Sequence, residues 1–176
     1  MDDLESWLTE WYPSAYRSAC LVLRDRGAAE EAVQEAFLRV WRFRGAIPAG
    51  DGRRAWLYRV VVNACMSRAR TESRWRARNA RAGDWDEPAA VTGLPAEAAE
   101  SNALAAAVTA ALADLPEHLR VPTVLRYYAG LSEREIATAI GRRPGTVKSR
   151  LYDARQRLSR DPRLAAWVDD LAEVSP

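Results

Sequence analysis

The chain has 176 residues, enough for one domain or two small ones. Its apolar content of 48% excludes wholesale disorder, and the sequence has no run of about 18 apolar residues that would span a membrane. The net charge is only +2, but the charges are unevenly distributed along the chain, which is more informative than their total.

The N-terminal sequence MDDLESW is acidic, so it is predicted to be neither a secretory signal nor a transit peptide. Cys20 and Cys65 are the only cysteines, and each lies in a helical apolar pattern, so we expect buried free thiols in a reducing cytoplasm. His118 stands alone and no CxxC pair exists, which argues against a metal site. Because the sequence also lacks a nucleotide-binding glycine loop, a Ser/His/Asp set and paired carboxylates, we expect no cofactor and no catalysis.

Residues 4–24 are predicted to form one helix or a broken pair, with Pro13 near the middle and Arg26-Gly27 at the end. The next helix has the most regular pattern in the chain, with apolar residues at i, i+3, i+4, i+7, i+8, i+11 and i+12 from Ala29 to Trp41. Its outward face is polar except for Leu38. That leucine is either an ordinary exposed residue or the apolar centre of a protein-binding patch.

A third helix is predicted from about Arg54 to Arg78, after a loop over residues 45–52. It begins with the apolar run AWLYRVVVNACM and ends in a basic tail. Asn63 interrupts the apolar run, and it is either hydrogen-bonded within a helix bundle or a donor and acceptor beside a pocket. Residues 53–81 contain a single acid and nine arginines: Arg53, Arg54, Arg59, Arg68, Arg70, Arg74, Arg76, Arg78 and Arg81.

Residues 79–101 lose helical periodicity and combine Pro and Gly with acids and alanines, so they are predicted to be a linker. We expect it to join two helical domains that have no stable interface of their own. Two further helices are predicted on either side of Pro116, and they supply apolar support for the segment that follows. A short amphipathic helix is predicted after Asp161, starting at Pro162.

Residues 131–158 are predicted to form a helix-turn-helix. Ser132 and Glu135 form a capping box, Gly141 supplies a left-handed residue at the turn, and Pro144 suits the first turn of the second helix. The apolar seam of that second helix consists of Val147, Leu151, Ala154 and Leu158.

The opposite face of the second helix is strongly basic. Residues 142–160 contain one acid, Asp153, and seven cations: Arg142, Arg143, Lys148, Arg150, Arg155, Arg157 and Arg160. An ordinary helical hairpin with a solvated basic face is the simpler interpretation. The density of cations beside Thr, Ser and Tyr favours DNA binding instead, because such a face donates hydrogen bonds to phosphates and to base edges in the major groove.

The order of these parts closely resembles a bacterial group IV sigma factor of the extracytoplasmic-function (ECF) type. The matching motifs are AAEEAVQEAFLRVWR, then RAWLYRVVVNACMSRAR, an acidic linker, and LPEHLRVPTVLRYYAGLSEREIATAIGRRPGTVKSRLYDARQRL. The resemblance implies an all-α fold of two small helical domains joined by a flexible acidic linker. The expected domains are a region 2-like bundle (1–78), the linker (79–101), a region 4-like helix-turn-helix domain (102–160) and a C-terminal extension (161–176).

In that family region 2 binds the clamp of core RNA polymerase and opens the −10 promoter element, whereas region 4 binds the polymerase flap and reads the −35 element. The resemblance places the polymerase contacts at Glu31, Gln34, Glu35, Leu38 and Arg39. It places Asn63 in a pocket for a flipped-out −10 base, and the stacking and strand contacts then fall to Trp56, Tyr58, Arg59, Arg68 and Arg70. The expected −35 contacts are Arg143, Thr146, Lys148, Ser149, Arg150, Tyr152, Asp153 and Arg155.

Asp153 departs from the family pattern, which often has a basic residue at this position. The expected partners are core RNA polymerase, promoter DNA and an anti-sigma factor, in the cytoplasm and without membrane insertion. A helix-turn-helix regulator that does not recruit polymerase explains residues 104–159 equally well but leaves the two N-terminal motifs unused. A nucleic-acid enzyme is disfavoured by the missing metal and acid/base groups.

Overall fold

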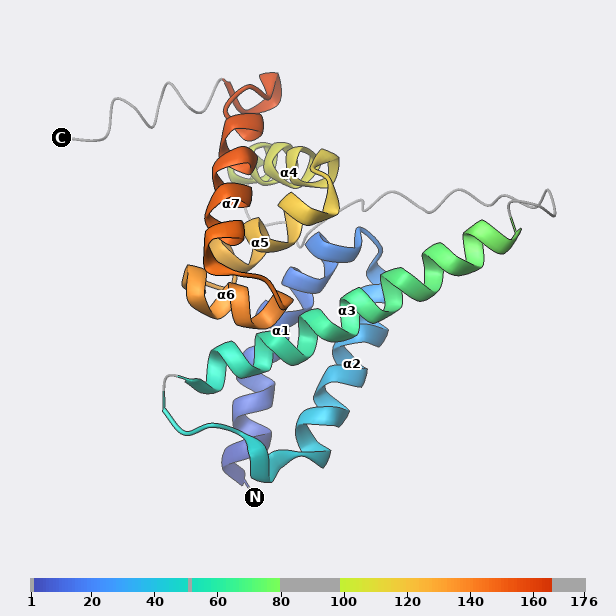
Figure 1. Ribbon diagram of the computed structural model, residues 1–176, viewed down its shortest axis with the longest axis vertical. Helices are drawn as coiled ribbons and strands as arrows, with labels where there is room; N and C mark the ends of the chain where they lie inside the picture. The colour runs from blue at the N-terminus through green and yellow to red at the C-terminus, as the bar shows by residue number, and fades with distance from the viewer. Residues whose placement is uncertain (1, 51, 80–98, 166–176) are drawn as a thin grey trace.

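The computed structural model describes residues 2–50, 52–79 and 99–165, and every regular element in these ranges is helical (Figure 1). The elements are α1 (Asp2–Leu23), α2 (Arg26–Arg42), the 3₁₀ turn η1 (Arg44–Ala46), α3 (Gly52–Asn79), α4 (Ala99–Asp114), α5 (Glu117–Tyr127), α6 (Glu133–Ile140) and α7 (Pro144–Leu158). The all-α prediction is confirmed. None of the described helices is both long and apolar enough to cross a membrane.

The first bundle consists of α1, α2 and α3. Despite Pro13, α1 is one continuous helix rather than a broken pair. It ends at Leu23 because Arg24 adopts a left-handed conformation, with φ of 62°. The Asp25 side chain then caps α2 by accepting a hydrogen bond from the Ala28 N–H at 2.7 Å. The prediction that Arg26-Gly27 ends the first helix is therefore wrong, because these residues begin α2.

The core of the first bundle follows the predicted apolar stripe of α2. Its buried residues are Ala29, Ala32, Val33, Ala36 and Val40, and they pack against buried residues of α1 and α3. Cys20 and Cys65 lie in the same core as free thiols, as predicted. Burial raises the pKa of Cys65 to about 12, so this thiol stays protonated and inert at neutral pH.

The second bundle consists of α4, α5, α6 and α7, and it contains the predicted helix-turn-helix. Ser132 and Glu135 form the capping box, with the Ser132 N–H donating to Glu135 Oε2 at 2.7 Å. The hydrogen bonds from Ser132 hold the pKa of Glu135 below its usual range. Gly141 ends α6 at φ of 63°, and Pro144 occupies the first turn of α7. All three local predictions are confirmed.

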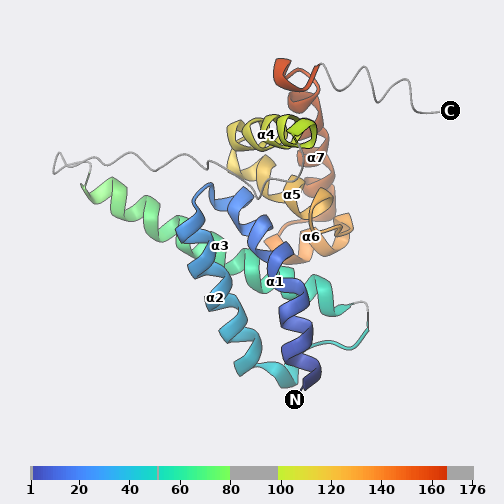
Figure 2. The same ribbon diagram turned by 180° about the vertical axis from the view of Figure 1, so that it is seen from behind.

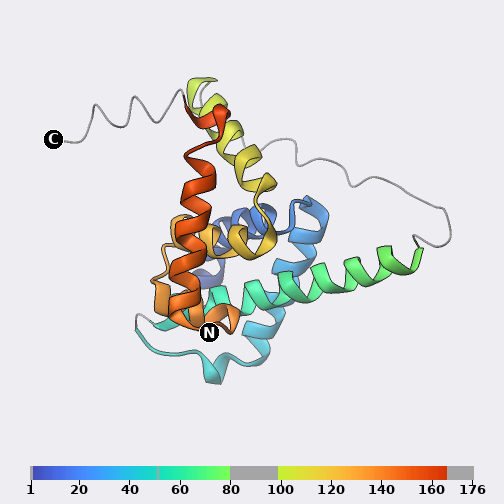
Figure 3. The same ribbon diagram turned by 45° about the horizontal axis from the view of Figure 1, so that its top comes forward.

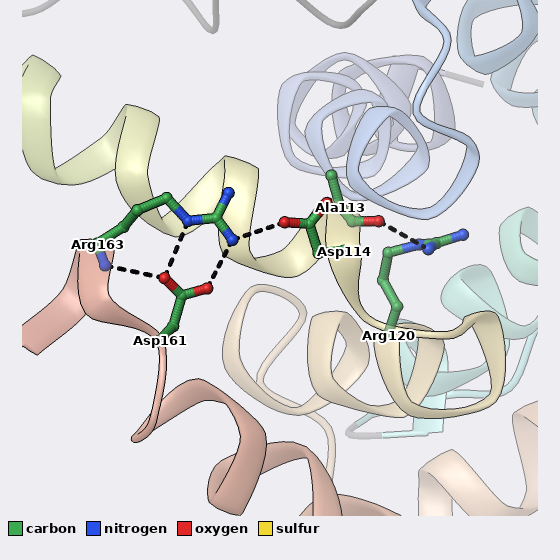
Figure 4. Close-up of polar contacts among 5 residues, drawn as sticks. All are labelled: Ala113, Asp114, Arg120, Asp161 and Arg163. Carbon is green, nitrogen blue, oxygen red and sulfur yellow. Dashed lines mark hydrogen bonds and ion pairs between the residues drawn. The ribbon is translucent and has the colours of Figure 1, made fainter.

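Beyond α7, residues 162–165 are helical, and the rest of the predicted C-terminal helix lies outside the described residues. Figure 3 shows this segment meeting α4 at the top of the view. The contact is made by Arg163, which pairs with Asp114 of α4 at 2.7 Å and with Asp161 at 2.6 Å (Figure 4).

Residues 80–98 of the predicted linker also lie outside the described residues. Helix α3 extends to Asn79 before them, and α4 begins at Ala99 after them.

The two bundles pack against each other, contrary to the expectation that they share no stable interface. The buried residues of both form one continuous core. Figure 1 shows α6 lying across α3, and Figure 2 shows α1 running beside α5. The composition of residues 79–101 gave no information about these contacts, because they are made by helices on either side of that segment.

Candidate nucleic-acid interface

The face of α7 that points away from the bundle carries the predicted DNA contacts. Val147, Leu151 and Ala154 are buried, so the helix is fixed with its polar side outward. Of the eight predicted contact residues, Thr146 and Arg150 are half-buried, and the others are exposed: Arg143, Lys148, Ser149, Tyr152, Asp153 and Arg155. Tyr152 is 56% exposed, so it offers a large aromatic surface beside the cations.

The charges on this face are available for a ligand. Within the described residues, no ion pair joins Asp153 to Arg150 or Arg157, the arginines three residues before and four residues after it. The Ser149 hydroxyl donates to the Thr146 carbonyl at 3.0 Å, which leaves its oxygen lone pairs free to accept a hydrogen bond. The face thus combines several donors and cations with a single exposed carboxylate.

A second polar face runs along α3. Trp56, Arg59, Asn63 and Arg70 are separated by three, four and seven residues, which places them on one side of the helix. Trp56 is half-buried and the other three are exposed. Asn63 makes no hydrogen bond to another described residue, so its amide is not committed to the bundle. An aromatic ring, two cations and a free amide are suitable groups for binding a single strand.

The structure contradicts the predicted stacking role of Tyr58. This residue is 1% exposed, its hydroxyl lies 2.6 Å from Ser14 Oγ, and its ring meets Trp11 edge to face. The residue belongs to the core because Tyr58, Val61, Val62 and Cys65 follow the helical repeat of the buried stripe. The same spacing is visible in the sequence and could have identified it.

The predicted polymerase contacts form the outer face of α2. Glu31, Gln34, Glu35, Leu38 and Arg39 are all exposed. Leu38 is 67% exposed, and Arg39 pairs with Glu35 across one turn. Arg68 of α3 pairs with Glu31, so this predicted strand contact adjoins the α2 face and does not share the face of Asn63.

Two arginines that the sequence did not single out connect the bundles. Arg120 of α5 is only 8% exposed, and its Nε donates to the Val22 carbonyl at the end of α1, at 3.2 Å. Burial lowers the pKa of its guanidinium. Arg54 of α3 donates to the Gly130 carbonyl between α5 and α6. Arg120 precedes Val124 by one helical turn, so its place on the apolar face of α5 was a usable signal.

Models of two protein families match the chain. Residues 7–75 match "Sigma-70 region 2", and residues 105–158 match "Sigma-70, region 4". Among curated proteins, the ECF RNA polymerase sigma factor SigE of Mycolicibacterium smegmatis is 34% identical over 143 residues, which cover 81% of this chain but 55% of that protein. The ECF RNA polymerase sigma factor SigK of Mycobacterium ulcerans is 32% identical over 144 residues, covering 79% of this chain and 74% of that protein.

Solved structures share the fold. The sigma factor RpoE of Bartonella quintana, in a co-crystal with the anti-sigma factor NepR, aligns with a TM-score of 0.75 at 23% identity, and the alignment covers 100% of both chains. CnrH, in complex with the cytosolic domain of CnrY, aligns with a TM-score of 0.60 at 20% identity over 95% of this chain and 88% of that one. At these identities the likeness concerns the arrangement of helices.

Proposed function

The chain belongs to the ECF sigma factors of the sigma-70 family, which are non-enzymatic factors for promoter-specific transcription initiation with RNA polymerase, and we propose that it divides this work between its two bundles. The observation that carries the proposal is the presence of both matched regions in one chain, each with an exposed polar face on the helix that its motif identifies.

In this proposal the first bundle binds the polymerase clamp and the −10 element. The outer face of α2, centred on Leu38, is the polymerase contact, because an exposed leucine ringed by polar groups suits a protein interface. On α3, Asn63 reads an extruded base while Trp56, Arg59 and Arg70 hold the strand. Arg68 of α3 links the −10 surface to the polymerase-binding face of α2 through its ion pair with Glu31.

The second bundle binds the polymerase flap and reads the −35 element with α7. Lys148, Arg150 and Arg155 supply phosphate contacts that fix the helix on the duplex. Thr146, Ser149, Tyr152 and Asp153 are the candidates for base contacts. We further propose that the protein acts in the cytoplasm and that an anti-sigma factor controls it, since both solved relatives are in complex with a partner and one of these partners is named as an anti-sigma factor.

Run-off transcription with core RNA polymerase on a promoter library tests this function. We expect transcripts that depend on the chain and that start downstream of a shared pair of sequence elements. A pull-down with core polymerase separates the proposal from the alternative of a regulator that binds duplex DNA alone. Duplex binding without polymerase binding or transcription would favour that alternative.

A further inference from the structure

A cavity of about 270 Å³ lies between α3 and α6, where α6 crosses α3 (Figure 1). Trp56 and Arg59 line it from α3, and Arg134 and Ala139 are among the residues that line it from α6. Pockets for drug-sized ligands have volumes of about 300–1,000 Å³. The cavity lies just below that range, so its size suits a smaller ligand, such as a pair of fused rings.

Most of the cavity wall is apolar. Ala55 and Ala139 contribute methyl groups, Gly52 has no side chain, and Trp56 contributes a half-buried indole ring. Aromatic rings pair with one another in offset-stacked or edge-to-face arrangements and bury a large apolar area when they do so. A ligand with a planar aromatic body therefore fits this wall better than an open polar chain.

Two guanidinium groups make the cavity positive. Arg59 and Arg134 are exposed, and neither side chain has a hydrogen-bond or ion-pair partner among residues 2–50, 52–79 and 99–165. Glu135 also lines the cavity, but its carboxylate already accepts hydrogen bonds from the Ser132 N–H at 2.7 Å and the Ser132 hydroxyl at 2.6 Å. Two uncommitted guanidiniums beside a committed carboxylate favour a negatively charged ligand, because charge-assisted hydrogen bonds from arginine are strong.

We propose that this cavity is a binding site for a small planar aromatic anion, whose rings lie against Trp56 and whose charge is held by Arg59 and Arg134. Trp56 and Arg59 also belong to the surface proposed for the −10 strand, so a bound ligand competes with a single strand. The competition rests on the proposed function, whereas the site rests on the cavity and its charges alone. No residue of α7 lines the cavity, so the ligand leaves duplex binding unchanged.

2-Naphthoate is a suitable probe, because it consists of two fused rings and one carboxylate. An NMR titration of the probe with the full-length chain measures its affinity. We expect a single site with a Kd on the order of 1 mM, the affinity that ordinary ligand efficiencies give for about 13 non-hydrogen atoms. 2-Naphthalenemethanol has the same rings without the charge, and it should bind at least tenfold more weakly because it makes no charge-assisted hydrogen bond.

Two substitutions at exposed positions of α6 locate the site. Arg134→Gln removes one of the two cations, and Thr138→Glu adds a carboxylate to the cavity wall. Each should weaken 2-naphthoate binding at least tenfold. Arg142→Gln is the matched control, since it makes the same charge change at an exposed arginine just beyond α6 that does not line the cavity. Its affinity for the probe should stay within about twofold of the wild type, and circular dichroism verifies that all three variants are folded.

A labelled pool of random 12-nucleotide single strands tests the competition. With 2-naphthoate at about nine times its Kd, one chain in ten has an empty cavity, so the apparent affinity for single strands should fall about tenfold. In Arg134→Gln the same probe concentration should lower it only about twofold. The affinity for random 20-base-pair duplexes should not change in either protein.

The site is overturned if 2-naphthoate does not bind, if the uncharged analogue binds equally well, or if both cavity variants keep the wild-type affinity for the probe. The competition is overturned if saturating probe leaves single-strand binding unchanged. Run-off transcription with core polymerase reveals a failure of the proposed function separately. A chain that binds 2-naphthoate as expected but supports no transcription would retain the site and lose the assignment of α3 to the −10 strand.

Discussion

Asp153 is the single acid on α7 and the residue whose role is least obvious from its surroundings. A carboxylate can accept a hydrogen bond from the N4 amino group of cytosine, but it repels phosphates and does not satisfy guanine acceptors. A surface ion pair with Arg150 or Arg157 would be worth only about 0.3–0.5 kcal/mol. Because no such pair is present among the described residues, we favour base reading.

Replacement of Asp153 by Ala distinguishes the two roles. If Asp153 reads a base, the variant should lose preference at one −35 position, where a wrong base pair costs about 1–3 kcal/mol. If it reads none, affinity should rise slightly for every sequence, because a negative charge near DNA is removed. The measurement is binding of the wild type and the variant to duplexes that carry each of the four bases at each −35 position. Uniform tightening would exclude the reading role.

Single residues were predictable where local chemistry decides their conformation. Gly141 and the capping pair Ser132 and Glu135 depend on neighbours within a few residues, and all three were correctly assigned. The burial of Tyr58 and Arg120 was missed although each lies in the apolar repeat of its own helix, and their partners on other helices could not be predicted. Arginine is rarely buried without a partner, and the carbonyls that Arg120 binds are invisible in a sequence pattern.

At the scale of the element, α2 allows a clean separation of binding from folding. Leu38→Ala with Gln34→Ala should weaken binding to core polymerase at least fivefold, which corresponds to about 1 kcal/mol. Thermal stability should change little, because neither side chain lies on the buried stripe. The measurements are polymerase affinity and melting temperature of the same preparation.

Val33→Ala is the matched control on the buried face of α2. It should lower the melting temperature through the lost packing of a fully buried side chain, with polymerase affinity unchanged at a temperature where the chain is folded. If the double variant on the outer face loses stability while keeping its polymerase affinity, the assignment of that face as an interface is wrong.

The N-terminus of α6 should contribute a pH-dependent part of the stability. The Glu135 pKa is lowered in the folded chain, mainly by the hydrogen bonds with Ser132. A group of this kind stabilises the fold above its unfolded pKa of about 4.3, and the contribution disappears as the pH falls through the folded pKa. Glu135→Gln keeps a capping side chain but has no charge to titrate.

We therefore expect the wild type to lose more stability than Glu135→Gln when the pH is lowered from 7 to 3. Urea unfolding of both proteins at a series of pH values measures the difference. The two curves should converge at low pH, where Glu135 is protonated. A constant gap over the whole range would show that the carboxylate acts by its shape and not by its charge.

At the scale of the whole molecule, the helices were largely predictable and their packing was not. Each helix is specified by its own apolar repeat and end signals, as the stripe from Ala29 to Val40 shows. The contact of α6 with α3 joins segments more than 50 residues apart along the chain. It depends on the complementary shape of two surfaces, and neither Ala139 nor Trp56 has a neighbour in sequence that indicates it.

Arg120 provides a test of whether the bundles fold as one unit. Its guanidinium donates to the Val22 carbonyl in the first bundle and, at 2.7 Å, to the Leu115 carbonyl in the second. Arg120→Met keeps much of the volume but leaves both carbonyls without this donor, at a cost of about 2–4 kcal/mol. We expect the main melting transition to fall by roughly 4–16 °C. Because the bond to Val22 crosses between the bundles, we also expect one calorimetric transition for the wild type and two for the variant.

Arg163→Met is the control, since Arg163 pairs at the surface with Asp114 and Asp161 and all three belong to the second bundle or its extension (Figure 4). It should shift the transition only slightly and should not divide it, because exposed ion pairs contribute little. If Arg120→Met melts in one transition at the wild-type temperature, the buried arginine does not couple the bundles. If both variants split the transition, the second bundle is losing its own stability, and coupling through Val22 is not the cause. Splitting in Arg120→Met alone would show that one buried cation couples the folding of the two bundles.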